Sequence, residues 1–409
     1  MDWSSLQESL GVLLMPLTYG FVGWLTNVVA IRMMFYPVEF RGIPPYLGWQ
    51  GIVPRRASGL ALKAVNTVSG KLFRIEEFFA KIPTQTLEKQ FREILENNIP
   101  VIGDHLLQTL PPALLAKLGE RDQKEIYEKA QKESLSKMKE ILAKLEEDVG
   151  KVFNFKNLVL RSLTGANVYR IIDMFQTIGE KEFRFIALSG WYFGALLGLV
   201  QMGLWFLYPL WWTLPLQGAF VGYITNYLAL TMVFRPQKPR QLGPWRYQGL
   251  FHKRRKEVSQ KYAELLANYV LNGRNIMDDL LYRRIARATV EIIQQGFIQL
   301  LSQKDLEESE KEALQVYQAE REAKGRDDVI LVADMLSQKA KTLEKMLDRT
   351  MAVEKTIAAR LAEMPPEEFE PILRTAFQQD EWILIVTGAV LGSLVGLVQG
   401  LYMAFATTS

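Results

Sequence analysis

The feature that most constrains the fold is a run of fifty residues, 185–234, without a single Asp, Glu, Lys or Arg. Charged residues make up 23% of the chain, so a gap of this length indicates a distinct environment. A helix needs about 20 apolar residues to cross a bilayer core, and this run is long enough for two crossings. Two further uncharged stretches lie near the two ends of the sequence. We therefore predict four transmembrane helices, at 9–36, 185–207, 213–235 and 383–405.

The chain also contains an internal repeat. The segment FVGWLTNVVAIRMMFYP (21–37) returns as FVGYITNYLALTMVFRP (220–236), with nine of seventeen positions identical. Each half of the chain consists of a predicted span, a polar block and a second span, in the same order and orientation. This arrangement predicts a parallel two-fold repeat. The predicted unit one, 1–208, holds a block at 38–184. The predicted unit two, 209–409, holds a block at 237–381.

The predicted fold class is all-α. Apolar residues in the polar blocks recur at steps of three and four, which is typical of amphipathic helices. Prolines, among them Pro100, are expected to break these helices. Cations follow spans one and three and precede span two, whereas the turn near 208–212 has none. By the positive-inside rule, both helical blocks are predicted to lie on the cytoplasmic side.

Composition excludes several classes of function. The chain has no cysteine and two histidines, so disulfides and thiolate or histidine metal centres are not expected. No phosphate-binding loop, zinc-protease motif or nucleophile elbow is present. We predict no catalytic residue, no metal, no cofactor, no enzymatic activity and no nucleic-acid partner. His105 and His252 are predicted to have surface or capping roles.

Polar side chains inside the predicted spans are the first candidate site. An amide within a bilayer needs a hydrogen-bond partner, because lipid offers none. For Asn27 the expected partner is Gln399, or Asn226 across the repeat axis. A polar groove for a solute or lipid headgroup is the alternative. The intramembrane candidates are Thr26, Asn27, Thr225, Asn226, Gln201 and Gln399.

Glycines at four-residue intervals in the second span of each unit form a second pattern. They line one face of a helix, which predicts close helix packing, with a gated path as the alternative. They are Gly190, Gly194, Gly198, Gly388, Gly392, Gly396 and Gly400.

Basic pairs follow the first span of each unit. They are predicted to lie at the membrane interface, where they set topology or recognise anionic lipid. They are Arg55, Arg56, Lys253 and Arg254.

These patterns favour a non-enzymatic protein that organises membranes or handles lipids. A passive channel or transporter for small solutes is one alternative, and a scaffold that recruits a membrane protein complex is another. The expected partners are membrane lipids, and the sequence leaves the oligomeric state open.

The combined motifs resemble the YheB-like family of uncharacterised membrane proteins. They stand here at Gly23–Pro37, Gly51–Arg56 and Gly392–Gln399. Length and tryptophan content are similar to the cyanobacterial branch, which implies the thylakoid membrane. A bacterial inner membrane is the alternative location.

Overall fold

The computed structural model describes residues 3–43, 47–69, 71–369, 371 and 381–408. The chain divides into two compact units. The first unit comprises Met1–Val68, Val159–Leu265 and Ile357–Ser409, and the second comprises Ser69–Leu158 and Leu266–Thr356. Each unit takes segments from both halves of the chain. This division follows the packing of helices from both halves of the chain, and the repeat units 1–208 and 209–409 stay a prediction.

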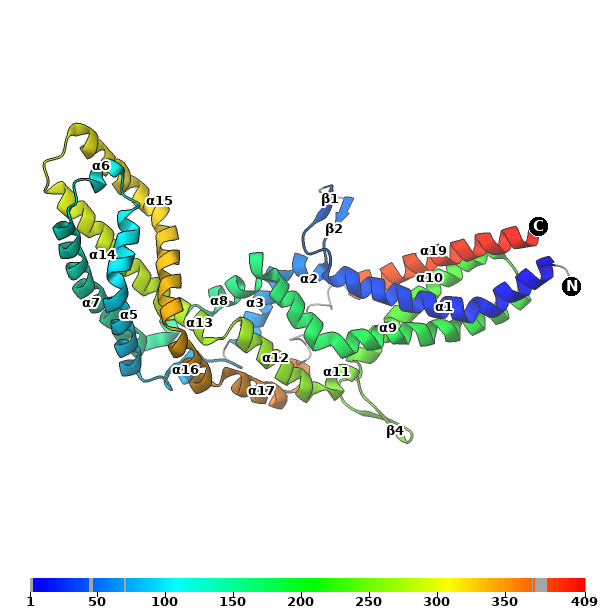
Figure 1. Cartoon of the computed structure of the whole chain (residues 1–409). Helices are drawn as coiled ribbons and strands as arrows, with labels where there is room; N and C mark the ends of the chain where they lie inside the picture. Colours follow the sequence, from blue (N-terminus) through cyan, green and yellow to red (C-terminus); the bar gives the residue numbers. More distant parts are fainter. Residues whose placement is uncertain (1–2, 44–46, 70, 370, 372–380, 409) are drawn as a thin grey trace. The chain divides into compact units, whose positions relative to one another are not determined.

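Four long helices form the main part of the first unit (Figure 1). α1 packs along α9, and α10 packs along α19. The short helix η2 (Trp211–Thr213) joins α9 to α10 and contacts α19. A cluster of buried apolar side chains, which includes Met15, Tyr19 and Leu214, lies between these helices. The bounds are α1 Trp3–Phe35, α9 Val168–Leu207, α10 Leu214–Phe234 and α19 Glu381–Thr408.

Three described helices are long and apolar enough to cross a membrane: Val12–Phe35, Gly165–Leu207 and Glu381–Phe405. The predicted fourth span, α10, is not among them. It carries no charged residue along its length, Leu214–Phe234.

Short elements complete the first unit. Two antiparallel hairpins follow α1 and α10, with Arg41 opposite Trp49 in one and Arg240 opposite Tyr247 in the other. Helices α8, α12 and α17 contain the unit boundaries. The elements are β1 Arg41–Ile43, β2 Leu47–Trp49, α2 Ile52–Arg55, α3 Ala57–Val68, α8 Phe155–Leu163, η1 Gly165–Asn167, β3 Arg240–Leu242, β4 Trp245–Tyr247, α11 Leu250–Lys253, α12 Arg255–Tyr269 and α17 Val353–Glu363.

The second unit is a bundle in which α14 contacts α5, α7 and α15, and α5 also contacts α7 and α15. Its core includes Phe91, Met138 and Phe297, all fully buried. The elements are α4 Ile75–Phe79, α5 Thr84–Leu107, α6 Pro112–Leu115, α7 Glu120–Val152, α13 Gly273–Met277, η3 Asp278–Tyr282, α14 Arg283–Ser302, α15 Glu308–Lys339 and α16 Lys341–Met351.

The prediction of an all-α chain is confirmed, since the only strands among the described residues form the two short hairpins. The prediction of a helix break at Pro100 is wrong, because α5 continues through it. A proline removes one helical hydrogen bond. Burial of Ile99 and Ile102 on either side keeps this helix packed despite that loss.

Candidate functional site

The glycines of α9 and α19 lie where two helix backbones touch. A Cβ atom on Gly190 would clash with the backbone of Gly23 in α1, and one on Gly392 with the backbone of Gly218 in α10. Gly194, Gly198, Gly388 and Gly396 face backbone in the same way, and Gly400 faces Trp211. The sequence analysis missed the glycines on the opposing helices, Gly20, Gly23, Gly218 and Gly222. Their spacing, Gly-x-x-Gly in one helix and Gly-x-x-x-Gly in the other, was the available signal.

Each of the two asparagines bonds to the neighbouring helix of its own pair. The side-chain amide of Asn27 donates to the carbonyl oxygen of Ile186 at 2.6 Å. That of Asn226 donates to the carbonyl oxygen of Leu384 at 2.7 Å. The expected partners of Asn27, namely Gln399 and Asn226, are therefore wrong. A backbone carbonyl is within reach because Gly190 and Gly388 have no side chain beside these amides.

The other polar candidates in these helices differ in their surroundings. Thr26 and Thr225 donate to carbonyl oxygens three residues earlier in their own helices. Gln201 donates to the hydroxyl of Tyr19 at 2.6 Å and so links α9 to α1. The side-chain oxygen of Gln399 is buried without a hydrogen-bond partner among the described residues.

A narrow, partly open cleft with a free volume of about 40 Å³ lies between α1, α9, α10, α11 and α19. Both asparagines line it, and they are 1% and 3% exposed. Apart from these amides and Glu182, the described residues of its wall are apolar. The apolar lining residues are Ala30, Ile31, Met34, Ile178, Gly179, Phe183, Ile186, Leu230, Val233, Phe234, Phe251 and Leu384.

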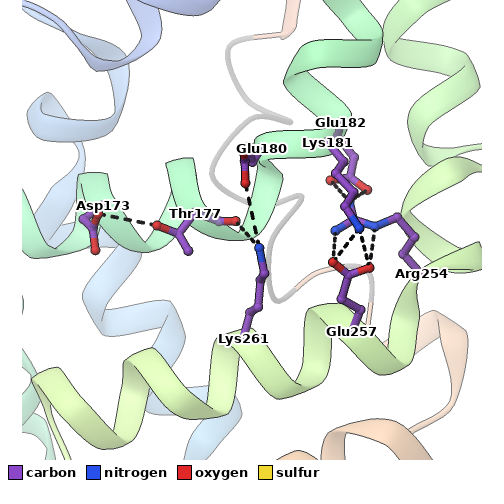
Figure 2. A network of polar contacts seen from close by, with 8 residues as sticks. All are labelled: Asp173, Thr177, Glu180, Lys181, Glu182, Arg254, Glu257 and Lys261. Atoms are coloured by element: carbon purple, nitrogen blue, oxygen red, sulfur yellow. Dashed lines mark hydrogen bonds and ion pairs between the residues drawn. The ribbon is translucent and has the colours of Figure 1, made fainter.

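Glu182 brings a carboxylate to the wall of this cleft and is 4% exposed. Both of its oxygens accept from one guanidinium nitrogen of Arg254, at 2.6 and 2.7 Å. Arg254 also donates to Glu257, which in turn accepts from Lys181. Figure 2 shows this four-residue network between α9 and α12. The sequence analysis missed Glu182 and Glu257, because paired carboxylates and cations are common on solvated helix faces.

The basic pairs do not share one environment. Arg55 and Lys253 are exposed, and Arg56 is half-buried. Arg254 was predicted to face the membrane interface, but its side chain is only 13% exposed and is held by two carboxylates. His252 was predicted to be at the surface or in a cap, yet it is 6% exposed beside the ring of Phe251. His252 is buried because it lies in α11, which packs against α10, and Arg254 is held by its ion pairs with Glu182 and Glu257.

The network predicts a specific dependence on pH. Hydrogen bonds from Arg254 and then from Lys181 lower the pKa of Glu257 from 4.5 to about 2. A depressed folded-state pKa stabilises the protein above pH 4.5, and this stabilisation is lost as the pH falls toward about 2. Glu257→Gln removes the titrating group. Its thermal midpoint should therefore fall less than that of the wild type across this window; parallel midpoint profiles would contradict the assignment.

Among the described residues there is no cluster of His, Asp and Glu that could hold a metal ion.

Together, the apolar helices and the comparisons with known proteins define a helical membrane protein. The chain is similar to a UPF0754 membrane protein of Listeria welshimeri, with 31% identity over 138 residues. A UPF0754 membrane protein of the cyanobacterium Microcystis aeruginosa is 28% identical over 158 residues. One of Shouchella clausii is 35% identical over 66 residues.

These similarities cover only part of each protein. The matched region spans 32% of this chain and 33% of the Listeria protein, and 36% of each in the Microcystis comparison. No family model matches the chain, and no solved structure matches it significantly. The comparisons support a family of uncharacterised membrane proteins. They support neither the YheB name nor a thylakoid location.

Proposed function

We propose that this chain is a non-enzymatic, lipid-handling membrane protein that holds a membrane amphiphile in the cleft between its long helices. The observation that carries the proposal is an apolar cleft whose wall contains two buried amides. The helices that form the cleft expose large apolar side chains on their outer faces. Ligand sites in proteins typically combine an apolar lining with a few placed polar groups.

Four spans are part of this proposal. Like the other long helices, α10 exposes large apolar side chains: Leu216 is 65% exposed and Phe220 is 58% exposed. Exposed apolar surface on this scale favours contact with lipid. In this proposal the polar blocks lie on the cytoplasmic side, and the cations near Arg32 and Lys253 support that orientation. The matching bonds of Asn27 and Asn226 are consistent with a parallel internal repeat.

A thylakoid location for this protein rests on the family resemblance, and a bacterial inner membrane fits the same architecture. A channel for solutes is less well supported than lipid handling, because water-filled pathways need more polar groups than this cleft offers.

Blocking the cleft tests the proposal. Ala30 is 4% exposed and lines the cleft, so Ala30→Phe should fill part of it. We expect lipids that co-purify with the full chain in mild detergent, identified by mass spectrometry, to fall at least fivefold. Val390→Phe is the matched control, because Val390 is 54% exposed on α19. Equal lipid content in the wild type and in both variants would refute the proposal.

A further inference from the structure

We propose that an open pocket at the end of α1 binds the headgroup of an anionic phospholipid from the surrounding membrane. The pocket lies between the last turns of α1 and the β1–β2 hairpin, and its free volume is about 760 Å³. Sites for small molecules typically have about 300–1,000 Å³. None of its described lining residues belongs to the cleft, so this inference goes beyond the proposed function and does not depend on it.

The pocket and the cleft occupy different faces of α1. Ala30 and Met34, four residues apart, line the cleft, whereas Val29, Arg32 and Met33 line the pocket. Residues three and four apart share one face of a helix, so each set forms its own stripe. A molecule in the pocket therefore contacts a face of α1 that the cleft does not use.

Hydrogen bonds fix the wall of the pocket. The indole Nε1 of Trp49, at the end of β2, donates to the carbonyl oxygen of Met33 in α1 at 3.2 Å. The side-chain amide of Gln50 donates to the carbonyl oxygen of Val38 at 2.8 Å. Trp49, Met33 and Val38 all line the pocket. The protein itself holds the hairpin against α1, so the pocket is formed before a ligand binds.

Two arginines give the pocket its charge. Arg32 and Arg41 line it and are exposed. Neither guanidinium forms a hydrogen bond or ion pair with a described residue, so both can donate to a ligand. Guanidinium groups bind phosphate oxygens strongly and with defined geometry. Glu39 adds one carboxylate to the wall, so two cations face one anion and the pocket favours an anionic ligand.

The position of the pocket indicates that the phosphate belongs to a lipid. Arg32 lies in the last turn of α1, within the apolar segment Val12–Phe35 that is long enough to cross a membrane. Beside it, Tyr36 and Phe40 line the pocket and are 45% and 44% exposed. Tyrosine and tryptophan side chains concentrate at the level of lipid headgroups. A cationic pocket with aromatic walls at this level meets the phosphates of the surrounding bilayer.

The test measures binding of lipids to the purified full chain in detergent by native mass spectrometry. The probes are palmitoyl-oleoyl phosphatidylglycerol, which is anionic, and phosphatidylcholine with the same acyl chains, which is zwitterionic. We expect phosphatidylglycerol to bind about fivefold more tightly, because the pocket attracts its phosphate and no ammonium group offsets that charge. Arg32→Gln/Arg41→Gln should remove this preference.

Arg240→Gln/Arg246→Gln is the matched control. It removes two exposed arginines from the other hairpin, where Thr231 stands at the position of Arg32 in the repeated segment. It should lower phosphatidylglycerol binding less than about twofold, because these arginines do not line the pocket. Glu39→Gln should raise phosphatidylglycerol binding by about twofold, because it removes a like charge from the wall.

The comparison of lipids on the wild type needs no variant, so it decides the matter even if a variant fails to fold. Equal binding of both lipids would overturn the inference. Equal losses in the two double variants would also overturn it, since positive charge would then act without a pocket. Displacement of the lipid by excess inorganic phosphate would overturn the lipid as the ligand. Ala30→Phe, which blocks the cleft, should leave phosphatidylglycerol binding unchanged, so the pocket and the proposed function can fail separately.

Discussion

Arg254→Leu is expected to lower the free energy of unfolding far more than removal of an exposed charge such as Arg274. The variant leaves the Glu182 carboxylate, whose side chain is 5% exposed, without its cation. Removing one partner of a buried ion pair typically lowers the free energy of unfolding by about 3–5 kcal/mol. The effect should appear as a lower thermal midpoint, followed by tryptophan fluorescence in detergent.

Two comparisons test the cause of this loss. Replacing both buried partners by apolar residues is often close to neutral, so Glu182→Leu/Arg254→Leu should recover much of the lost stability. Arg274→Leu breaks an ion pair with Asp334 in which both side chains are more than half exposed. It should change stability by no more than about 1 kcal/mol. If Arg254→Leu behaved like Arg274→Leu, the pair with Glu182 would not be buried in solution.

Gly190→Ala is the second substitution with a large expected effect. The added methyl group would collide with the backbone of Gly23, and backbone cannot move aside as a flexible side chain can. Overpacking of this kind lowers stability by about 1–3 kcal/mol, and loss of the Asn27 bond would add to it. The same thermal measurement should show a clear decrease in the midpoint.

The same helix contains its own control. A Cβ atom on Gly203 would meet nothing within 4 Å. Alanine is favoured over glycine inside a helix by about 0.5–1 kcal/mol, so Gly203→Ala should be neutral or slightly stabilising. Equal effects at positions 190 and 203 would mean that α1 and α9 are not in close contact.

Much of this architecture could be predicted from the sequence because its signals are local. Uncharged runs located the long helices, and glycines every fourth residue marked the faces of α9 and α19. The partners of these residues could not be predicted in the same way. The bond of Asn27 joins residues 159 positions apart, and its acceptor is a backbone carbonyl, a group that every residue carries.

For the same reason, only some residues of the candidate site could be predicted from the sequence. Asn27 and Asn226 stood out because amides are rare in apolar segments. Glu182 did not stand out, because it lies in a charged stretch, Glu180 to Arg184, that reads as a solvated helix face. Its burial arises from Arg254, 72 residues later, and no local pattern connects the two.

The asparagine bonds have a consequence for how the protein fits its bilayer. Each bond fixes the axial position of one helix against its neighbour, so neither helix of a pair can slide past the other without breaking it. The apolar part of α1 has 24 residues, about 36 Å at 1.5 Å per residue, which exceeds a typical hydrocarbon thickness of about 30 Å. A thinner membrane must therefore be met by tilting each pair as a rigid body or by deforming the surrounding lipid.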